Sequence, residues 1–225
     1  MADLLQELGQ RLASVGLSRH GGFHPSPEDA VPALPDGTSP GTVVMVGNVG
    51  SAFWAHVQAS PEGRGPDPID RWTERVLGRI AAELGAVALF PFAGPPWHPF
   101  QRWARRADPA LSPSPLGILI HPDHGLWHAL RGALLFRERL VLPSIEPRPS
   151  PCIACETKPC LRHCPVEAFT TAGYDVTSCR SYLATLSGQP CMIQGCRARA
   201  ACPVGRSNAY TSDQIQHHMR RFARG

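Results

Sequence analysis

The residues with the most evident chemistry in this sequence are eight cysteines, all of which lie between Cys152 and Cys202. The first four form a run Cys-x2-Cys-x4-Cys-x3-Cys-Pro that ends at Cys164-Pro165, and a second Cys-Pro pair stands at Cys202. A ferredoxin loop of the form Cys-x2-Cys-x2-Cys-x3-Cys-Pro gives three thiolates to one [4Fe-4S] cluster and the fourth to its neighbour. The run here has two extra residues between its second and third cysteines, but its ending and the total of eight thiols predict two [4Fe-4S] clusters.

The crossing rule of two-cluster ferredoxins divides the cysteines into two sets that are not contiguous in sequence. Set 1 joins three cysteines of the first run to the last cysteine of the chain: Cys152, Cys155, Cys160 and Cys202. Set 2 joins three later cysteines to the one that crosses over from the first run: Cys179, Cys191, Cys196 and Cys164. These eight residues are the predicted metal ligands.

Three other roles for the cysteines compete with iron and sulfur. A disulfide framework belongs to secreted chains, but the sequence begins Met-Ala-Asp-Leu-Leu-Gln-Glu-Leu, which has neither the basic nor the apolar region of a signal peptide. Zinc is the stronger competitor, because four-thiolate zinc sites are built from similarly spaced cysteine pairs. Free structural thiols are a poor account of so dense a cluster. Iron is therefore preferred and zinc is kept as the alternative.

Charge and hydropathy limit the remaining classes of function. From residue 151 onward nine basic residues face four acidic ones, and two clusters with thiolate ligands would offset most of that excess. A nucleic-acid surface is therefore not expected, although Arg220, Arg221 and Arg224 form a local basic group. No stretch approaches the ~20 apolar residues of a membrane span. The sequence predicts a soluble, cytoplasmic protein.

Hydrophobic spacing predicts a mixture of helices and strands before the cysteines. Leucines at helical spacing indicate a helix over 4–15, and Asp67-Pro68 opens a second helix that ends before Gly85. Short apolar runs predict strands, at 42–46, 86–91, 116–121 and 132–136. This order predicts an α+β class with a central sheet and flanking helices. The proline-rich segment 143–151 reads as a linker between residues 1–142 and the cysteine-bearing part, residues 152–225.

Two further segments before the linker could hold a ligand. Gly47-Asn-Val-Gly50 follows a strand, but Val49 stands where a dinucleotide fingerprint needs glycine, so a tight turn with Ser51 as helix cap is the better reading. The segment from His121 to His128 clusters imidazoles that could bind a metal, transfer protons or form a polar loop. All five tryptophans also precede the linker, and they could pack a core or line a flat pocket for a ring cofactor.

The sequence also resembles known families in two places. Residues 67–80, and above all Leu116-Gly-Ile-Leu-Ile-His-Pro-Asp-His-Gly-Leu-Trp-His-Ala-Leu-Arg-Gly-Ala-Leu-Leu135, resemble the cobalamin-processing family of the type C cobalamin disorder. That likeness implies a nitroreductase-like fold over 1–142, bound cobalamin, and a corrinoid pocket that includes His121, Gly125 and Trp127. The cysteine-bearing part resembles the two-cluster, ferredoxin-like module of epoxyqueuosine reductases and reductive dehalogenases.

Together these resemblances imply an iron-sulfur protein that passes electrons to a corrinoid, and, if it is an enzyme, an oxidoreductase. The alternative is an electron-transfer protein whose N-terminal part binds a redox protein partner. A flavin-dependent reductase or an epoxyqueuosine reductase-like enzyme is weaker. Epoxyqueuosine reductases carry an acidic residue ahead of the strand that corresponds to 116–121, whereas Phe90-Pro-Phe-Ala-Gly-Pro-Pro-Trp-His98 has none, and the helical repeats of that family are missing.

Overall fold

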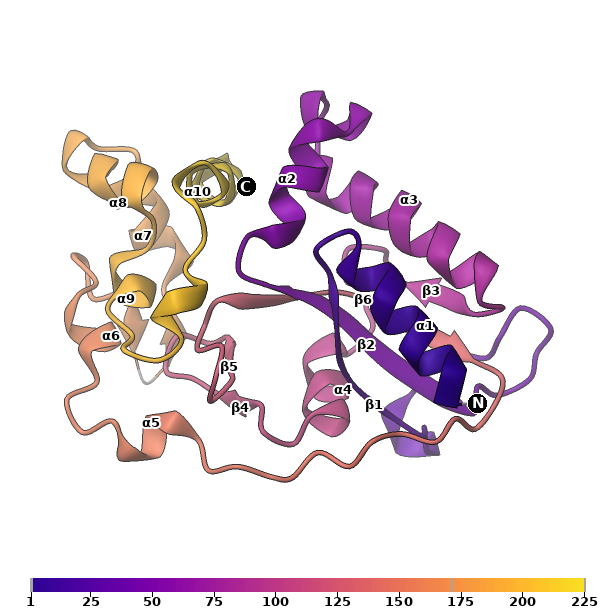
Figure 1. Cartoon of the computed structure of the whole chain (residues 1–225). Coiled ribbons are helices and arrows are strands. Elements are labelled where there is room, and N and C mark those ends of the chain that lie inside the picture. The colour runs from indigo at the N-terminus through magenta and orange to yellow at the C-terminus, as the bar shows by residue number, and fades with distance from the viewer. Residues whose placement is uncertain (1, 171, 225) are drawn as a thin grey trace. The chain divides into compact units, whose positions relative to one another are not determined.

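The computed structural model describes residues 2–170 and 172–224 and divides the chain into two compact units (Figure 1). The sheet unit comprises the residues up to Pro109 together with Ala129–Pro147. The cysteine unit comprises Ala110–His128 together with the residues from Arg148 onward. The segment around His121 thus belongs to the same unit as the cysteines. The predicted domains, 1–142 and 152–225 with a linker at 143–151, were instead continuous stretches of sequence. Whether those stretches are separate domains stays a prediction.

The sheet unit is built on a four-stranded sheet with the strand order β1-β2-β6-β3. Its members are β1 (Ser18–Phe23), β2 (Thr42–Val49), β3 (Val87–Leu89) and β6 (His128–Phe136). β1 pairs antiparallel with β2, and β3 pairs antiparallel with β6. The long strands β2 and β6 are mostly buried, as their continuous runs of Val, Met, Leu and Ala require.

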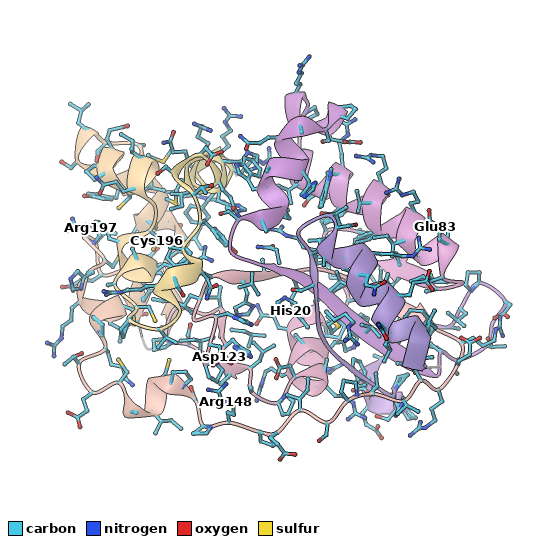
Figure 2. The ribbon with its side chains drawn as sticks, viewed as in Figure 1. His20, Glu83, Asp123, Arg148, Cys196 and Arg197 are labelled. Carbon is cyan, nitrogen blue, oxygen red and sulfur yellow. The ribbon has the colours of Figure 1, made fainter. Side chains whose placement is uncertain are left out.

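Three helices cover one face of this sheet: α1 (Ala2–Ala13), α2 (Ala52–Ala59) and α3 (Pro68–Glu83). Their apolar residues recur every three or four positions, so each helix presents one stripe to a shared core with Val44 and Val46 of β2. An ion pair between Arg11 of α1 and Glu83 of α3 lies on the surface of this layer, where Figure 2 labels Glu83. A fourth helix, α4 (Phe100–Ala107), packs against β1 and β2.

The cysteine unit contains short elements joined by tight turns. Its strands form two ribbons, β4 (Ser112–Pro113) with β5 (Leu119–Ile120), and β7 (Phe169–Thr170) with β8 (Gly173–Tyr174). Its helices are α5 (Pro151–Ala154), α6 (Pro159–Arg162), α7 (Val176–Leu183), α8 (Gln189–Gln194), α9 (Arg197–Ala200) and α10 (Ser212–Arg224). Every cysteine lies on one of these helices or within a few residues of one. Short helices between ligands let the chain return repeatedly to the same point.

The sequence-based expectations for the first half are largely confirmed. α1 and α3 occupy the predicted helices, and the strands expected at 42–46, 86–91 and 132–136 form β2, β3 and β6. The strand expected at 116–121 is wrong in extent and place, because Gly117 turns the chain at φ 75°, Leu119–Ile120 pairs only with Ser112–Pro113, outside the central sheet, and His121 forms a single bridge with Gly125. Ser51 precedes α2 as predicted, but its side chain makes no capping hydrogen bond.

The mixed α+β class with an antiparallel sheet and flanking helices is confirmed by the structure. Within the described residues, no helix combines the length and the apolar character needed to cross a bilayer.

Candidate functional site

The four cysteines of set 1 line one small cavity of about 20 Å³ in the cysteine unit. Cys152 lies on α5, Cys155 directly follows it, Cys160 lies on α6, and Cys202 comes from the far end of the cysteine segment. The remaining wall is apolar and rich in proline: Pro115, Ile120, Pro151, Pro159, Pro203 and Val204, with Lys158 beside them. The structure therefore brings the distant Cys202 to the first run, as the crossing rule predicts.

The four cysteines of set 2 line a second and larger cavity of about 380 Å³. Cys179 lies on α7, Cys191 on α8, and Cys196 directly precedes α9, while Cys164 crosses over from the first run. Four aromatic side chains form part of the wall, and one of them, the Tyr174 ring, stacks on the rings of Phe169 and Phe222 at centroid distances of 4.6 and 6.0 Å. Each cavity thus contains one predicted set and no cysteine of the other.

The surroundings of the thiols decide which charge state they prefer. Burial raises the pKa of Cys152 and Cys160, and the nearby Cys202 raises both further. Burial likewise raises the pKa of Cys191 and Cys196. These four thiols therefore favour the protonated form, because thiolates are disfavoured in a poorly solvated space. A bound metal centre would reverse this preference, because its positive charge would stabilise the thiolates.

Backbone amides point at the sulfurs of set 2. The Ala168 amide donates to Cys164 Sγ at 3.3 Å, and amides of the first turn of α9 donate to Cys191 and Cys196. Such bonds favour thiolate over thiol and are one of the levers by which a protein adjusts an iron-sulfur centre. The donor chemistry of set 2 therefore fits thiolates that bind a cluster.

No group of three or more His, Cys, Asp and Glu side chains converges on a single metal-ion position in residues 2–170 and 172–224. Each set instead surrounds a cavity. A four-iron cube lies between its thiolates and takes one thiolate per iron, so its ligands stand farther apart than those of a single tetrahedral ion. Four thiols line each cavity, which is the number and type of ligand that a four-iron cube takes.

The short segment from Cys196 to Cys202 joins the two sets. Its helix α9 places Ala198, which is 1% exposed, in one apolar cluster with Cys160 and Cys202 of set 1 and Cys164 and Cys196 of set 2. Both sets are therefore packed against a common core. A change that displaces α9 is expected to disturb both.

The histidine segment forms a compact turn in the cysteine unit. The rings of His121 and His124 stack at a centroid distance of 4.3 Å, and backbone amides of Asp123 and His124 donate to His121 Nδ1. His128 contacts the Leu119 carbonyl through Nε2 at 3.1 Å. Burial lowers the pKa of His128 to about 4, and the neighbouring His121 and His124 add to the effect. His128 is therefore neutral at physiological pH and suits packing rather than proton transfer.

The turn is tied to the cysteine-bearing segment at several points. Arg148 donates to the Asp123 carboxylate at 2.7 Å, just ahead of set 1, and both residues are labelled in Figure 2. On the other side, Arg199 of α9 donates to the Leu126 carbonyl, and its guanidinium lies 4.5 Å from the Trp127 ring and 4.6 Å from the Tyr210 ring. Such cation-π contacts contribute about 1 to 2 kcal/mol each when desolvated.

The structure gives the three predicted corrinoid-pocket residues clear packing roles. Trp127 is 5% exposed and is enclosed by Arg199 and Tyr210. Gly125 bonds with His121 through both backbone groups and lies against Val204. None of His121, Gly125 and Trp127 lines either cysteine cavity. Their role toward a corrinoid therefore stays a prediction that depends on the resemblance.

The residues that support the site could not be recognised from the sequence. Arg199, Tyr210, Tyr174 and Phe222 have no ligand spacing of their own, and only the fold brings them to the cysteines and to Trp127. One signal was present for Arg199, which stands midway between two predicted ligands of different sets, Cys196 and Cys202.

Two tyrosines of this unit give a matched stability test. The Tyr210 hydroxyl is buried and has no hydrogen-bond partner among the described residues, whereas the Tyr182 hydroxyl donates to the Ser187 carbonyl at 2.6 Å. We expect Tyr210→Phe to leave the free energy of unfolding unchanged or to raise it by up to about 1 kcal/mol, and Tyr182→Phe to lower it by about 1 kcal/mol. Denaturant unfolding of both variants measures this, and a larger loss in Tyr210→Phe would show that its hydroxyl has a partner.

Known proteins share the fold of this chain but not its sequence. No family model and no curated protein matches the chain. Among solved structures, it is similar to the B12-trafficking protein CblC of C. elegans, a homologue of human MMACHC, with a TM-score of 0.57, 14% identity and coverage of 99% of this chain and 92% of the other. It is also similar to epoxyqueuosine reductase of Streptococcus thermophilus, with a TM-score of 0.51, 12% identity and coverage of 93% of this chain and 66% of the other.

The chain has the fold of these two proteins. This confirms the coarse prediction, a CblC-like arrangement of a mixed sheet and helices shared with epoxyqueuosine reductase. At these identities the likeness shows the fold alone. The two-cluster module and the corrinoid remain proposals.

Proposed function

We propose that this protein is an iron-sulfur redox protein that holds two [4Fe-4S] clusters and passes electrons to a corrinoid. The observation that carries the proposal is the sorting of eight cysteines into two cavities of four, with Cys202 in the first and Cys164 in the second. Eight thiols in two sets are the ligand complement of two cubes. Likeness in fold to a B12-trafficking protein and to epoxyqueuosine reductase supports the corrinoid as electron acceptor.

When bound, the clusters would supply one-electron redox chemistry, and the work of the protein is to hold and adjust them. Set 1 encloses its cavity with proline and other apolar side chains, which exclude water. Set 2 offers amide donors from Ala168 and from α9, which stabilise thiolate charge. The packing of Ala198 between the sets keeps their separation fixed.

Metal analysis under anaerobic conditions tests the first half of the proposal. We expect about eight irons and about eight sulfides per chain, and no zinc. Four irons, or two zinc ions in place of the iron, would contradict the two-cluster assignment.

Titration with cobalamin tests the second half. We expect the cluster-loaded protein, reduced with dithionite and freed of excess reductant, to change the absorbance of added hydroxocobalamin in proportion to the protein, because a bound corrinoid receives its electrons. A variant that lacks set 2, Cys164→Ser with Cys191→Ser, serves as the control and should transfer fewer electrons per chain. A loaded protein that neither binds cobalamin nor alters its spectrum would overturn the corrinoid assignment.

The second candidate function is electron transfer to a protein partner without a bound corrinoid. The enclosure of Trp127 between Arg199 and Tyr210 favours it, because that ring is already packed in the cysteine unit. Normal cluster spectra together with no affinity for cobalamin or flavin would support this candidate. A yellow cofactor released on denaturation would instead indicate a flavin-dependent reductase.

A further inference from the structure

Exposed apolar side chains gather around set 2. Ile118 and Tyr174 line its cavity and are still 39% and 37% exposed. Leu186 precedes α8, the helix that carries Cys191, and Ile193 lies on it; they are 90% and 53% exposed. Single exposed apolar residues need no explanation, but several beside one site are typical of an interaction surface. We call these four residues the apolar patch.

The same region carries an excess of positive charge. Arg197 lines the cavity and is exposed, as Figure 2 shows beside Cys196. Arg180 lies over the Phe222 ring, and α10, which contributes Met219 and Phe222 to the cavity, exposes three more arginines, Arg220, Arg221 and Arg224. The acidic residues on these and adjoining elements are fewer: Glu167, Asp175 and Asp213. Basic residues therefore outnumber acidic ones on the elements that carry or adjoin the apolar patch.

Set 1 lacks this combination. Its cavity is about 20 Å³, against about 380 Å³ for set 2, and prolines form much of its wall. Ile153, between Cys152 and Cys155, is exposed beside it, and the charged neighbours of set 1 are of both signs: Glu156, Lys158, Arg162 and Arg206. The two sets thus differ in the size of their cavities, and more arginines and more exposed apolar residues lie on the elements around set 2.

We propose that the apolar patch and its arginines form the docking surface for a small acidic electron-carrier protein of the ferredoxin or flavodoxin type, which delivers electrons to the set 2 cluster. This inference rests on the proposed function, since it needs the clusters to be present. Opposite charges steer such partners together, and electron-transfer contacts are small and sensitive to salt. Exposed apolar residues together with an excess of arginines on the same and adjoining elements suit that kind of contact.

The electron balance of the step is simple. The reduced carrier loses one electron and is oxidised, and the set 2 cluster gains that electron. No bond forms or breaks, and no proton is required. The step therefore depends on how closely the two proteins approach, so changes to the surface should alter its rate and leave the cluster intact.

Stopped-flow mixing with a reduced plant-type [2Fe-2S] ferredoxin, an acidic one-electron carrier, tests the inference. We expect Leu186→Ser with Ile193→Ser to lower the second-order rate constant for cluster reduction about tenfold. Arg220→Glu with Arg224→Glu should lower it at low ionic strength by about tenfold or more and should flatten its salt dependence, because charge steering changes association rates by this order. None of these four residues is among the described residues that line a cysteine cavity, so iron content and reduction by dithionite should not change.

Three matched variants decide between this surface and others. Val141→Ser removes an apolar residue of similar exposure, 70%, and Arg64→Glu reverses an exposed charge, both in the sheet unit, and neither should change the rate. Ile153→Ser makes the same change beside set 1, and a larger loss there than in Leu186→Ser with Ile193→Ser would overturn the proposal. Equal rates in all variants would also overturn the proposal. So would tight binding of RNA, if the RNA competes with ferredoxin and its affinity depends on the arginines but not on Leu186. Wild-type protein without iron would instead count against the proposed function.

Discussion

A double variant with Cys164→Ser and Cys191→Ser will retain about four irons per chain, whereas Cys152→Ser with Cys164→Ser will retain almost none. The first pair belongs to one cavity, so its loss should remove one cluster and leave the other. The second pair takes one ligand from each cavity, so it should remove both clusters. Iron and sulfide quantification after anaerobic purification measures the difference.

The same two variants exclude the simplest competing arrangement. If the clusters followed the order of the sequence, the first four cysteines would bind one cluster and the last four would bind the other. Cys152→Ser with Cys164→Ser would then leave about four irons, and Cys164→Ser with Cys191→Ser would leave almost none, the reverse of the expected result. Electron paramagnetic resonance of the reduced protein adds a control, because the cluster that survives should keep its wild-type signal.

The grouping of the cysteines could be predicted from sequence because it depends mainly on the number and the spacing of the cysteines. Ligand number and the Cys-Pro endings restrict the ways in which eight thiols can surround two cubes, and the structure places Cys164 and Cys202 in the cavities that the crossing rule assigns. The helices α1 and α3 were also predictable, since each covers the sheet with one apolar stripe.

The supporting contacts were not predictable in this way. Arg199 acts through two rings, Trp127 and Tyr210, that come from distant parts of the chain, and no local pattern encodes that meeting. The strand expected at 116–121 failed for a related reason. Most of its apolar run is buried in the cysteine unit, where Leu116 and Ile120 pack with Cys160 and Cys202, and burial alone does not distinguish a strand from a packed turn.

Gly125→Ala is expected to lower the free energy of unfolding by about 3 kcal/mol or more and to prevent binding of the set 1 cluster. Gly125 has φ 60°, a conformation that disfavours any side chain, and an added Cβ would overlap the Val204 carbonyl. Gly205, on the opposing segment, takes part in the same close approach, because a Cβ added there would overlap the backbone of His124. The two backbone segments must therefore separate, and one of them, Val204–Gly205, begins two residues after Cys202.

Gly117→Ala provides the matched control, because Gly117 lies in the same unit at φ 75° but has open space where the Cβ would stand. It should show only the backbone cost, about 1 kcal/mol, and keep about eight irons. Comparing denaturant unfolding and iron content in the two variants separates steric overlap from backbone strain. The comparison also decides what Gly125 does: if Gly125→Ala keeps its iron and stability yet loses affinity for cobalamin, the glycine is a corrinoid contact, as the resemblance implies. A joint loss of stability and of four irons would show instead that it holds the histidine turn against the end of set 1.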